Sequence, residues 1–140
     1  MNTNLHTSTS EEVEKLGLIY AKNGFFSPVD AISKAQAEEL RQDFEAAEEE
    51  LRGDTERLSL LKAYPNRLLP SFDNATRNET LVAAAKEILG ENILVWSAAL
   101  FIKEAASTKI VSWHQDLTYW QLNDIKAVSY THLRAHETDR

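Results

Sequence analysis

The chain has 140 residues, of which 43% are hydrophobic and 26% are charged, with a formal net charge of -7 and no cysteine. This length allows one domain with a core of its own, and the composition is that of a globular protein. The acidic balance argues against nucleic acid or an anionic membrane as the main partner, because both bind basic surfaces. The lack of cysteine excludes disulfides, thiolate metal sites and cysteine nucleophiles.

The N-terminal residues 1–10 are rich in Asn, Thr and Ser, which predicts a disordered polar lead that includes His6. They lack the basic and then apolar pattern of a secretory signal. The longest apolar run, residues 93–102, is too short to cross a bilayer as a helix. We therefore expect a cytoplasmic protein with no membrane partner.

Three segments have the patterns of helices. The first lies within residues 11–20, where Leu16 and Tyr20 are four positions apart. The second begins at a capping box of Ser33 and Gln36 and carries an apolar stripe as far as Leu51, with most of its glutamates off that stripe. The third has Asn78 as its N-cap and ends at Gly90.

Other segments have the patterns of strands and turns. An apolar stretch at residues 25–32 contains a proline that suits a sheet edge, and residues 57–70 predict an irregular connection or brief strands. Residues 93–102 predict a strand buried on both faces, residues 105–108 a turn, and residues 110–113 a second strand. Together with the helices, these segments predict the α+β class.

The second of these strands leads into the stretch 113–120, which is the strongest functional signal in the chain. Its sequence is Trp-His-Gln-Asp-Leu-Thr-Tyr-Trp. On an extended strand, His114 and Asp116 would point to the same side and converge on one ion. An imidazole and a carboxylate supply two of the three ligands of the facial triad that binds non-haem Fe(II). By itself a His-x-Asp pair also occurs by chance or as a structural hydrogen bond.

The residues around this pair resemble the phytanoyl-CoA dioxygenase (PhyH) family of Fe(II)/2-oxoglutarate oxygenases. The likeness includes the stretch 113–120, the segment Phe101-Ile102-Lys103-Glu104 and the segment Asn23-Gly24-Phe25-Phe26, so residues 11–128 are similar to the N-terminal part of such an enzyme domain. The resemblance implies a partial double-stranded β-helix, or jelly roll, flanked by N-terminal helices. It also implies a dioxygenase that hydroxylates a small organic substrate and converts 2-oxoglutarate to succinate.

The same resemblance implies roles for individual residues. His114 and Asp116 would be two ligands of Fe(II), while Lys103 and Trp120 would lie near the pocket of the cosubstrate 2-oxoglutarate. Because halogenating relatives replace the carboxylate by a small residue, Asp116 favours hydroxylation. Lys103 as a plain surface lysine and Trp120 as a core aromatic are the alternatives. The third iron ligand, expected as a distal histidine, and the arginine that holds 2-oxoglutarate have no counterpart in this sequence.

Residues 129–140 break the pattern expected of the family. They resemble an ending that recurs on truncated sequences assembled from environmental reads, so we expect a fragment with a non-native tail that is catalytically inactive. His132 and His136 in this tail are four positions apart, a spacing that would pair them on a helix. We assign neither as a ligand, because no carboxylate motif accompanies them.

Two other functions are consistent with the sequence. One is a non-catalytic domain that binds a small molecule or another protein through the acidic helix at residues 33–51. The other is a metal-dependent hydrolase using His114, Asp116 and His132, which requires the three side chains to meet at one point. The sequence identifies neither the substrate nor the oligomeric state.

Overall fold

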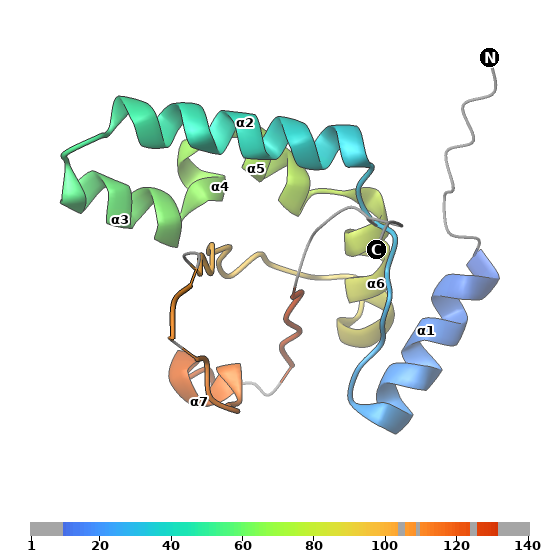
Figure 1. The fold of residues 1–140 in the computed structure, drawn as a ribbon. Coiled ribbons are helices and arrows are strands. Elements are labelled where there is room, and N and C mark those ends of the chain that lie inside the picture. The colour runs from blue at the N-terminus through green and yellow to red at the C-terminus, as the bar shows by residue number, and fades with distance from the viewer. Residues whose placement is uncertain (1–9, 104–105, 109, 124–125, 132–140) are drawn as a thin grey trace, which may run out of the picture.

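The computed structural model describes residues 10–103, 106–108, 110–123 and 126–131. Most of the described residues up to Leu89 lie in helices, and an extended segment with one further short helix follows (Figure 1). The elements are α1 (Ser10–Asn23), α2 (Lys34–Glu50), α3 (Thr55–Ala63), α4 (Pro65–Leu68), α5 (Pro70–Thr76), α6 (Glu79–Leu89) and α7 (Asp116–Trp120). Residues 1–9 of the predicted polar lead lie outside the described residues, and Ser10 already belongs to α1.

The three predicted helices are confirmed. Helix α2 begins at the capping box, in which the Ser33 hydroxyl accepts from the Gln36 amide at 3.2 Å and the Gln36 side chain accepts from the Ser33 amide at 2.8 Å. Helix α6 begins at Asn78, whose side-chain oxygen accepts from the amides of Thr80 and Leu81. Gly90 follows α6 with a φ of 92°, a conformation that glycine adopts without strain.

The helices enclose a small core in two parts. Helix α1 packs on α6, where Leu16 is buried with Leu81, Ala84 and Ala85. Helix α2 packs on α5 through the rings of Phe44 and Phe72, whose centroids are 6.4 Å apart. In Figure 1, α2 lies across the top with α3, α4 and α5 beneath it, and α1 and α6 lie to one side. Leu61 of α3 is the most deeply buried of the core side chains, at 1% exposure.

The α+β class with a partial jelly roll, which the sequence predicted, is wrong for the described residues. They contain helices and extended segments but no strand, and therefore no sheet. Residues 57–70 are also helical where a connection or brief strands were expected. The prolines there do not prevent this, because Pro65 and Pro70 occupy the first positions of α4 and α5, where the missing amide hydrogen costs nothing.

The predicted buried strand at residues 93–102 is extended but exposed. Leu94 is 88% exposed and Phe101 is 85% exposed, and the residues at 110–113 are exposed as well. An extended segment becomes a strand only when a second one pairs with its backbone, and no paired segment is present in the described part of the chain. Instead, the Leu100 amide donates to the carbonyl of Lys62 in α3 at 2.8 Å.

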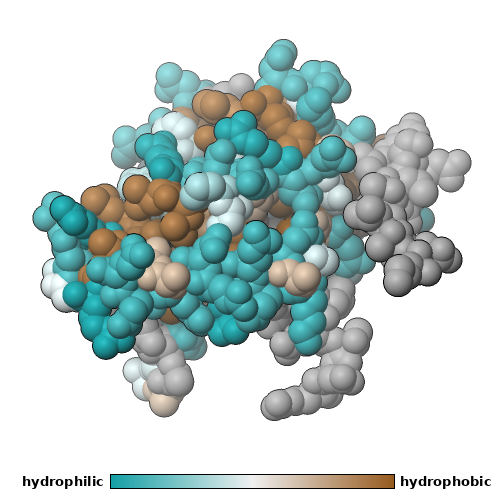
Figure 2. All heavy atoms as spheres, turned by 90° about the horizontal axis from the view of Figure 1, so that it is seen from above, coloured by the Kyte–Doolittle hydropathy of each residue, from teal (hydrophilic) through white to brown (hydrophobic). Residues whose placement is uncertain are grey.

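The apolar segments at residues 25–32, 93–102 and 110–113 have the composition of strands, but they lack the long-range pairing that a sheet requires. This explains why the prediction from local pattern failed. Figure 2 shows apolar patches open among hydrophilic side chains on the face seen from above. None of the helices in the described part of the chain is both long enough and apolar enough to span a bilayer.

Candidate metal centre

The candidate centre lies where the extended segment turns into α7. His114 precedes this helix and Asp116 is its first residue, so the two side chains converge through a helix start and not through the alternation of a strand. That part of the sequence prediction is corrected. Nε2 of His114 and Oδ1 of Asp116 are nevertheless 3.1 Å apart. Their side chains are 33% and 40% exposed, so an ion from solvent can reach both.

The other nitrogen of the imidazole is held by the backbone. Nδ1 of His114 lies 2.8 Å from the carbonyl oxygen of Ser112, which can only accept, so Nδ1 carries a hydrogen and donates it. In the neutral imidazole, Nε2 then has a free lone pair. This lone pair faces a carboxylate oxygen that is also an acceptor, so the two atoms need a cation between them.

A proton is one such cation. The pKa of His114 is raised above its ordinary value of 6.5, first by the hydrogen bond to Ser112 and then by the charge and hydrogen bond of Asp116, while desolvation opposes the shift. A protonated imidazole donates from both nitrogens, which satisfies Ser112 and Asp116 together.

A metal ion is the second kind of cation that fits between Nε2 of His114 and Oδ1 of Asp116. Bonds from a transition metal to imidazole nitrogen or carboxylate oxygen are about 2.1 Å long, so two such ligands at right angles lie about 3.0 Å apart. The observed 3.1 Å between Nε2 and Oδ1 matches that spacing. A ligating histidine almost always donates its other N–H to a carbonyl or carboxylate, as His114 does to Ser112. The donor atoms present therefore fit a metal.

Aromatic and apolar side chains surround this pair. A shallow, open hollow contains both His114 and Asp116 and is otherwise lined by Phe101, Ile110, Val111, Ser112, Tyr119 and Trp120. Tyr119 also contacts the imidazole directly, with ring centroids 5.9 Å apart and planes at 75°. The sequence analysis did not connect Tyr119 with His114, and the three-residue offset of Tyr119 from Asp116 on α7 was the available signal.

The two residues predicted to lie near the cosubstrate, Lys103 and Trp120, differ in their position relative to the hollow. Trp120 ends α7 and lines the hollow together with the candidate ligands. Lys103 is exposed and is not among the lining residues, although Phe101, two positions earlier, is. The structure therefore places Trp120 in the lining of the hollow beside the pair and leaves Lys103 outside that lining.

No third ligand lies near the pair among the described residues, where no group of three His, Cys, Asp or Glu side chains is arranged to hold a metal. His132, which the hydrolase hypothesis requires, and His136 lie outside the described residues, as does His6. The second carboxylate oxygen of Asp116, Oδ2, accepts a hydrogen bond from the Ser129 hydroxyl. Ser129 belongs to the segment that the sequence predicts to be a non-native tail.

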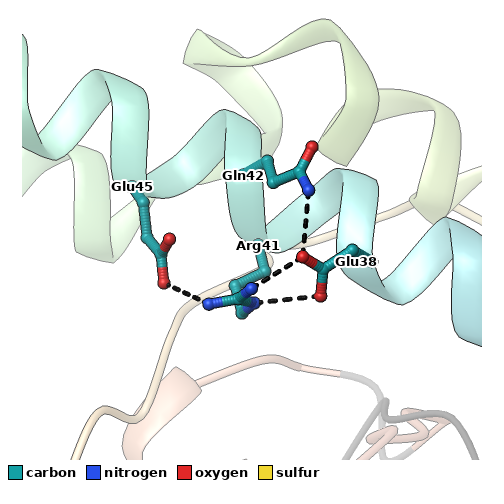
Figure 3. A network of polar contacts seen from close by, with 4 residues as sticks. All are labelled: Glu38, Arg41, Gln42 and Glu45. Atoms are coloured by element: carbon teal, nitrogen blue, oxygen red, sulfur yellow. Dashed lines mark hydrogen bonds and ion pairs between the residues drawn. The ribbon is translucent and has the colours of Figure 1, made fainter.

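The acidic helix α2 is the second candidate surface. Its negative charge is partly neutralised by a basic side chain of the same helix. Arg41 bridges Glu38 at 2.6 Å and Glu45 at 2.9 Å, and Gln42 donates to Glu38 (Figure 3). The hydrogen bond with Arg41 lowers the pKa of Glu38. All four side chains lie on the exposed face of α2, which is the arrangement of a solvated helix.

An imidazole and a carboxylate close enough to hold one cation, beside an apolar hollow, define a candidate mononuclear metal site. The sequence model described as phytanoyl-CoA dioxygenase (PhyH) matches residues 20–137, well over half of the chain. The chain belongs to the phytanoyl-CoA dioxygenase family, which assigns it to the dioxygenases at the level of the family. Searches among curated proteins and among solved structures found no match.

Proposed function

We propose that the chain carries part of the iron site of an Fe(II)/2-oxoglutarate-dependent dioxygenase that hydroxylates a small organic substrate. His114 and Asp116 are the two ligands that this chain supplies. The observation that carries the proposal is the 3.1 Å separation of Nε2 and Oδ1, with Nδ1 already bonded to a backbone carbonyl. Membership of a dioxygenase family supports the choice of iron over other metals.

The residues of the chain have separable tasks in this function. The Ser112 carbonyl fixes the tautomer of His114, so that the lone pair of Nε2 is available to the metal. Asp116 supplies negative charge and an oxygen donor, and its presence favours hydroxylation over halogenation. When bound, the iron and 2-oxoglutarate supply the oxidising power for attack on a C–H bond, with release of succinate and carbon dioxide.

The hollow beside the pair provides the apolar surroundings for this chemistry. Trp120, Phe101 and Ile110 line it and place apolar surface beside the proposed metal position. We assign Trp120 to the cosubstrate pocket on this basis. Lys103 is proposed as an ammonium partner for a carboxylate of 2-oxoglutarate, since a charge-assisted contact of this kind is strong.

Two ligands bind a divalent ion weakly, so the test is a direct measurement of affinity. We expect the purified chain to bind Co(II), used as a stable probe for Fe(II), with visible absorption that reports coordination. Asp116→Asn should weaken binding by at least about tenfold, because even residues that only support a ligand have effects of that size. Glu56→Gln, an exposed carboxylate on α3, is the matched control and should leave the affinity unchanged.

The result that overturns the assignment is equal affinity in the wild-type and Asp116→Asn chains. Far-UV circular dichroism checks that both variants keep the helical content. Because Asp116 lies outside the core, we expect no loss of fold. Equal weakening by Asp116→Asn and Glu56→Gln would show that binding depends on net charge and not on this pair.

A further inference from the structure

Helix α7 presents two side chains to the same imidazole. Asp116 and Tyr119 are three positions apart, so they lie on one face of the short helix. Oδ1 of Asp116 approaches Nε2 of His114 at 3.1 Å, and the ring of Tyr119 meets the imidazole ring at 75° with centroids 5.9 Å apart. This tilted geometry is one that aromatic pairs prefer.

We propose that Tyr119 is a positioning residue for His114, which rests on the proposed function of the pair as metal ligands. Rotation of a histidine ring about its Cβ–Cγ bond, the χ2 torsion, has a broad energy profile. The Ser112 carbonyl fixes the ring at Nδ1, but a single hydrogen bond does not fix the plane of the ring. The Tyr119 ring supplies the second restraint, so that Nε2 stays directed at Asp116 when no cation is bound.

The exposure of Tyr119 separates this role from a structural one. Tyr119 is 71% exposed and is absent from the buried core, so its ring contributes little to the packing of the helices. Trp96 provides a natural comparison, because it is an exposed aromatic that lines neither of the two hollows beside the pair. Among the described residues, the ring partner of His114 is Tyr119.

The experiment compares Tyr119→Ala, Tyr119→Phe and Trp96→Ala in the full chain. The first measurement is the proton and carbon chemical shifts of the His114 imidazole without metal, assigned with a His114→Gln variant. We expect Tyr119→Ala to move these signals, because the neighbouring ring current is lost. Tyr119→Phe and Trp96→Ala should leave them near their wild-type positions.

The second measurement is the affinity of each variant for Co(II). We expect Tyr119→Ala to weaken binding about two- to tenfold, the range that an aromatic pair contributes, and Tyr119→Phe to restore it. Rescue by phenylalanine distinguishes the ring contact from any role of the hydroxyl. Trp96→Ala should bind as the wild type does.

Two results overturn the inference: His114 signals and Co(II) affinity that are unchanged in Tyr119→Ala, or a loss in Tyr119→Phe as large as that in Tyr119→Ala. If the wild-type chain binds no Co(II), the proposed function fails on its own. The imidazole signals of the metal-free variants still decide whether Tyr119 contacts the ring.

Discussion

At the scale of single residues, the candidate centre depends on which cation lies between His114 and Asp116. The Ser112 carbonyl leaves Nε2 as an acceptor in the neutral ring, and Asp116 presents another acceptor to it. If the pair holds a metal ion as proposed, a proton competes with that ion for the same position. The site should favour the proton at low pH and the metal at higher pH.

This competition predicts a raised titration midpoint for His114. In NMR titrations of the metal-free chain, we expect His114 to titrate above 6.5, and Asp116→Asn to lower its pKa because a negative charge next to the imidazolium is lost. Since the folded-state pKa is raised, the contribution of His114 to stability is present below the unfolded-state pKa of 6.5 and is lost as the pH rises through the folded-state value. An identical midpoint in both chains would contradict the ion pair.

At the scale of the elements, the helices are specified by local signals and fixed by a few buried side chains. Ser33 and Asn78 set the starts of α2 and α6, and Leu61 is the most deeply buried side chain of α3. An ion pair of 3.0 Å between Lys62 and Glu48 also joins α3 to α2. This contact is partly exposed, so burial of Leu61 is the larger contribution.

Two adjacent leucines test that statement. Leu61 is 1% exposed and Leu60 is 48% exposed, although both lie in α3. We expect Leu61→Ala to lower the free energy of unfolding by about 2–5 kcal/mol, because it removes buried methyl groups and leaves a cavity. Leu60→Ala, measured by the same denaturant titration, should cost well under half as much. Equal costs would mean that α3 does not pack as described.

The sequence predicts these helices because their signals are local. The capping box, the spacing of the apolar stripe in α2 and the Gly90 terminator are all read within one or two turns. The strand predictions failed for the opposite reason, since pairing joins residues far apart in sequence and residues 93–102 have no such partner among those described. The prediction of an irregular connection at residues 57–70 was also wrong, because Pro65 and Pro70 begin helices there.

The site was predicted in part for a related reason. His114 and Asp116 are two positions apart, so either a strand or a helix start brings them together, and the distance between their donor atoms is short even though the expected strand is absent. The contact of Tyr119 with the imidazole required the turn of α7, which the sequence analysis had not predicted. The Leu100 contact with Lys62 has no sequence signal at all.

At the scale of the whole molecule, the helical body is packed and the segment that follows α6 leaves large apolar side chains exposed. They include Leu94, Phe101, Ile110 and Trp113. Large exposed apolar side chains promote association between copies of a chain. The absence of strand pairing in the described part of this segment adds to that tendency.

We therefore expect self-association that increases with protein concentration. Replacement of Phe101 and Trp113 together by serine should reduce it, because two of the most exposed large apolar side chains are removed. Sedimentation velocity at several concentrations measures the effect. Leu18→Ser is the control, since Leu18 is 73% exposed but lies on α1, away from that segment. A chain that stays monomeric at all concentrations would contradict the prediction.

The backbone hydrogen bond between the Leu100 amide and the Lys62 carbonyl attaches the site-bearing segment to the helices. The hydroxyl of Tyr130, which donates to the Leu81 carbonyl at 2.6 Å, attaches it at a second point. Segments with few buried contacts open at lower free energy than the core does. The amide of Leu100 should thus exchange its hydrogen faster than those inside α6. A bound metal would slow that exchange, so ligand binding and local ordering of this segment are thermodynamically linked.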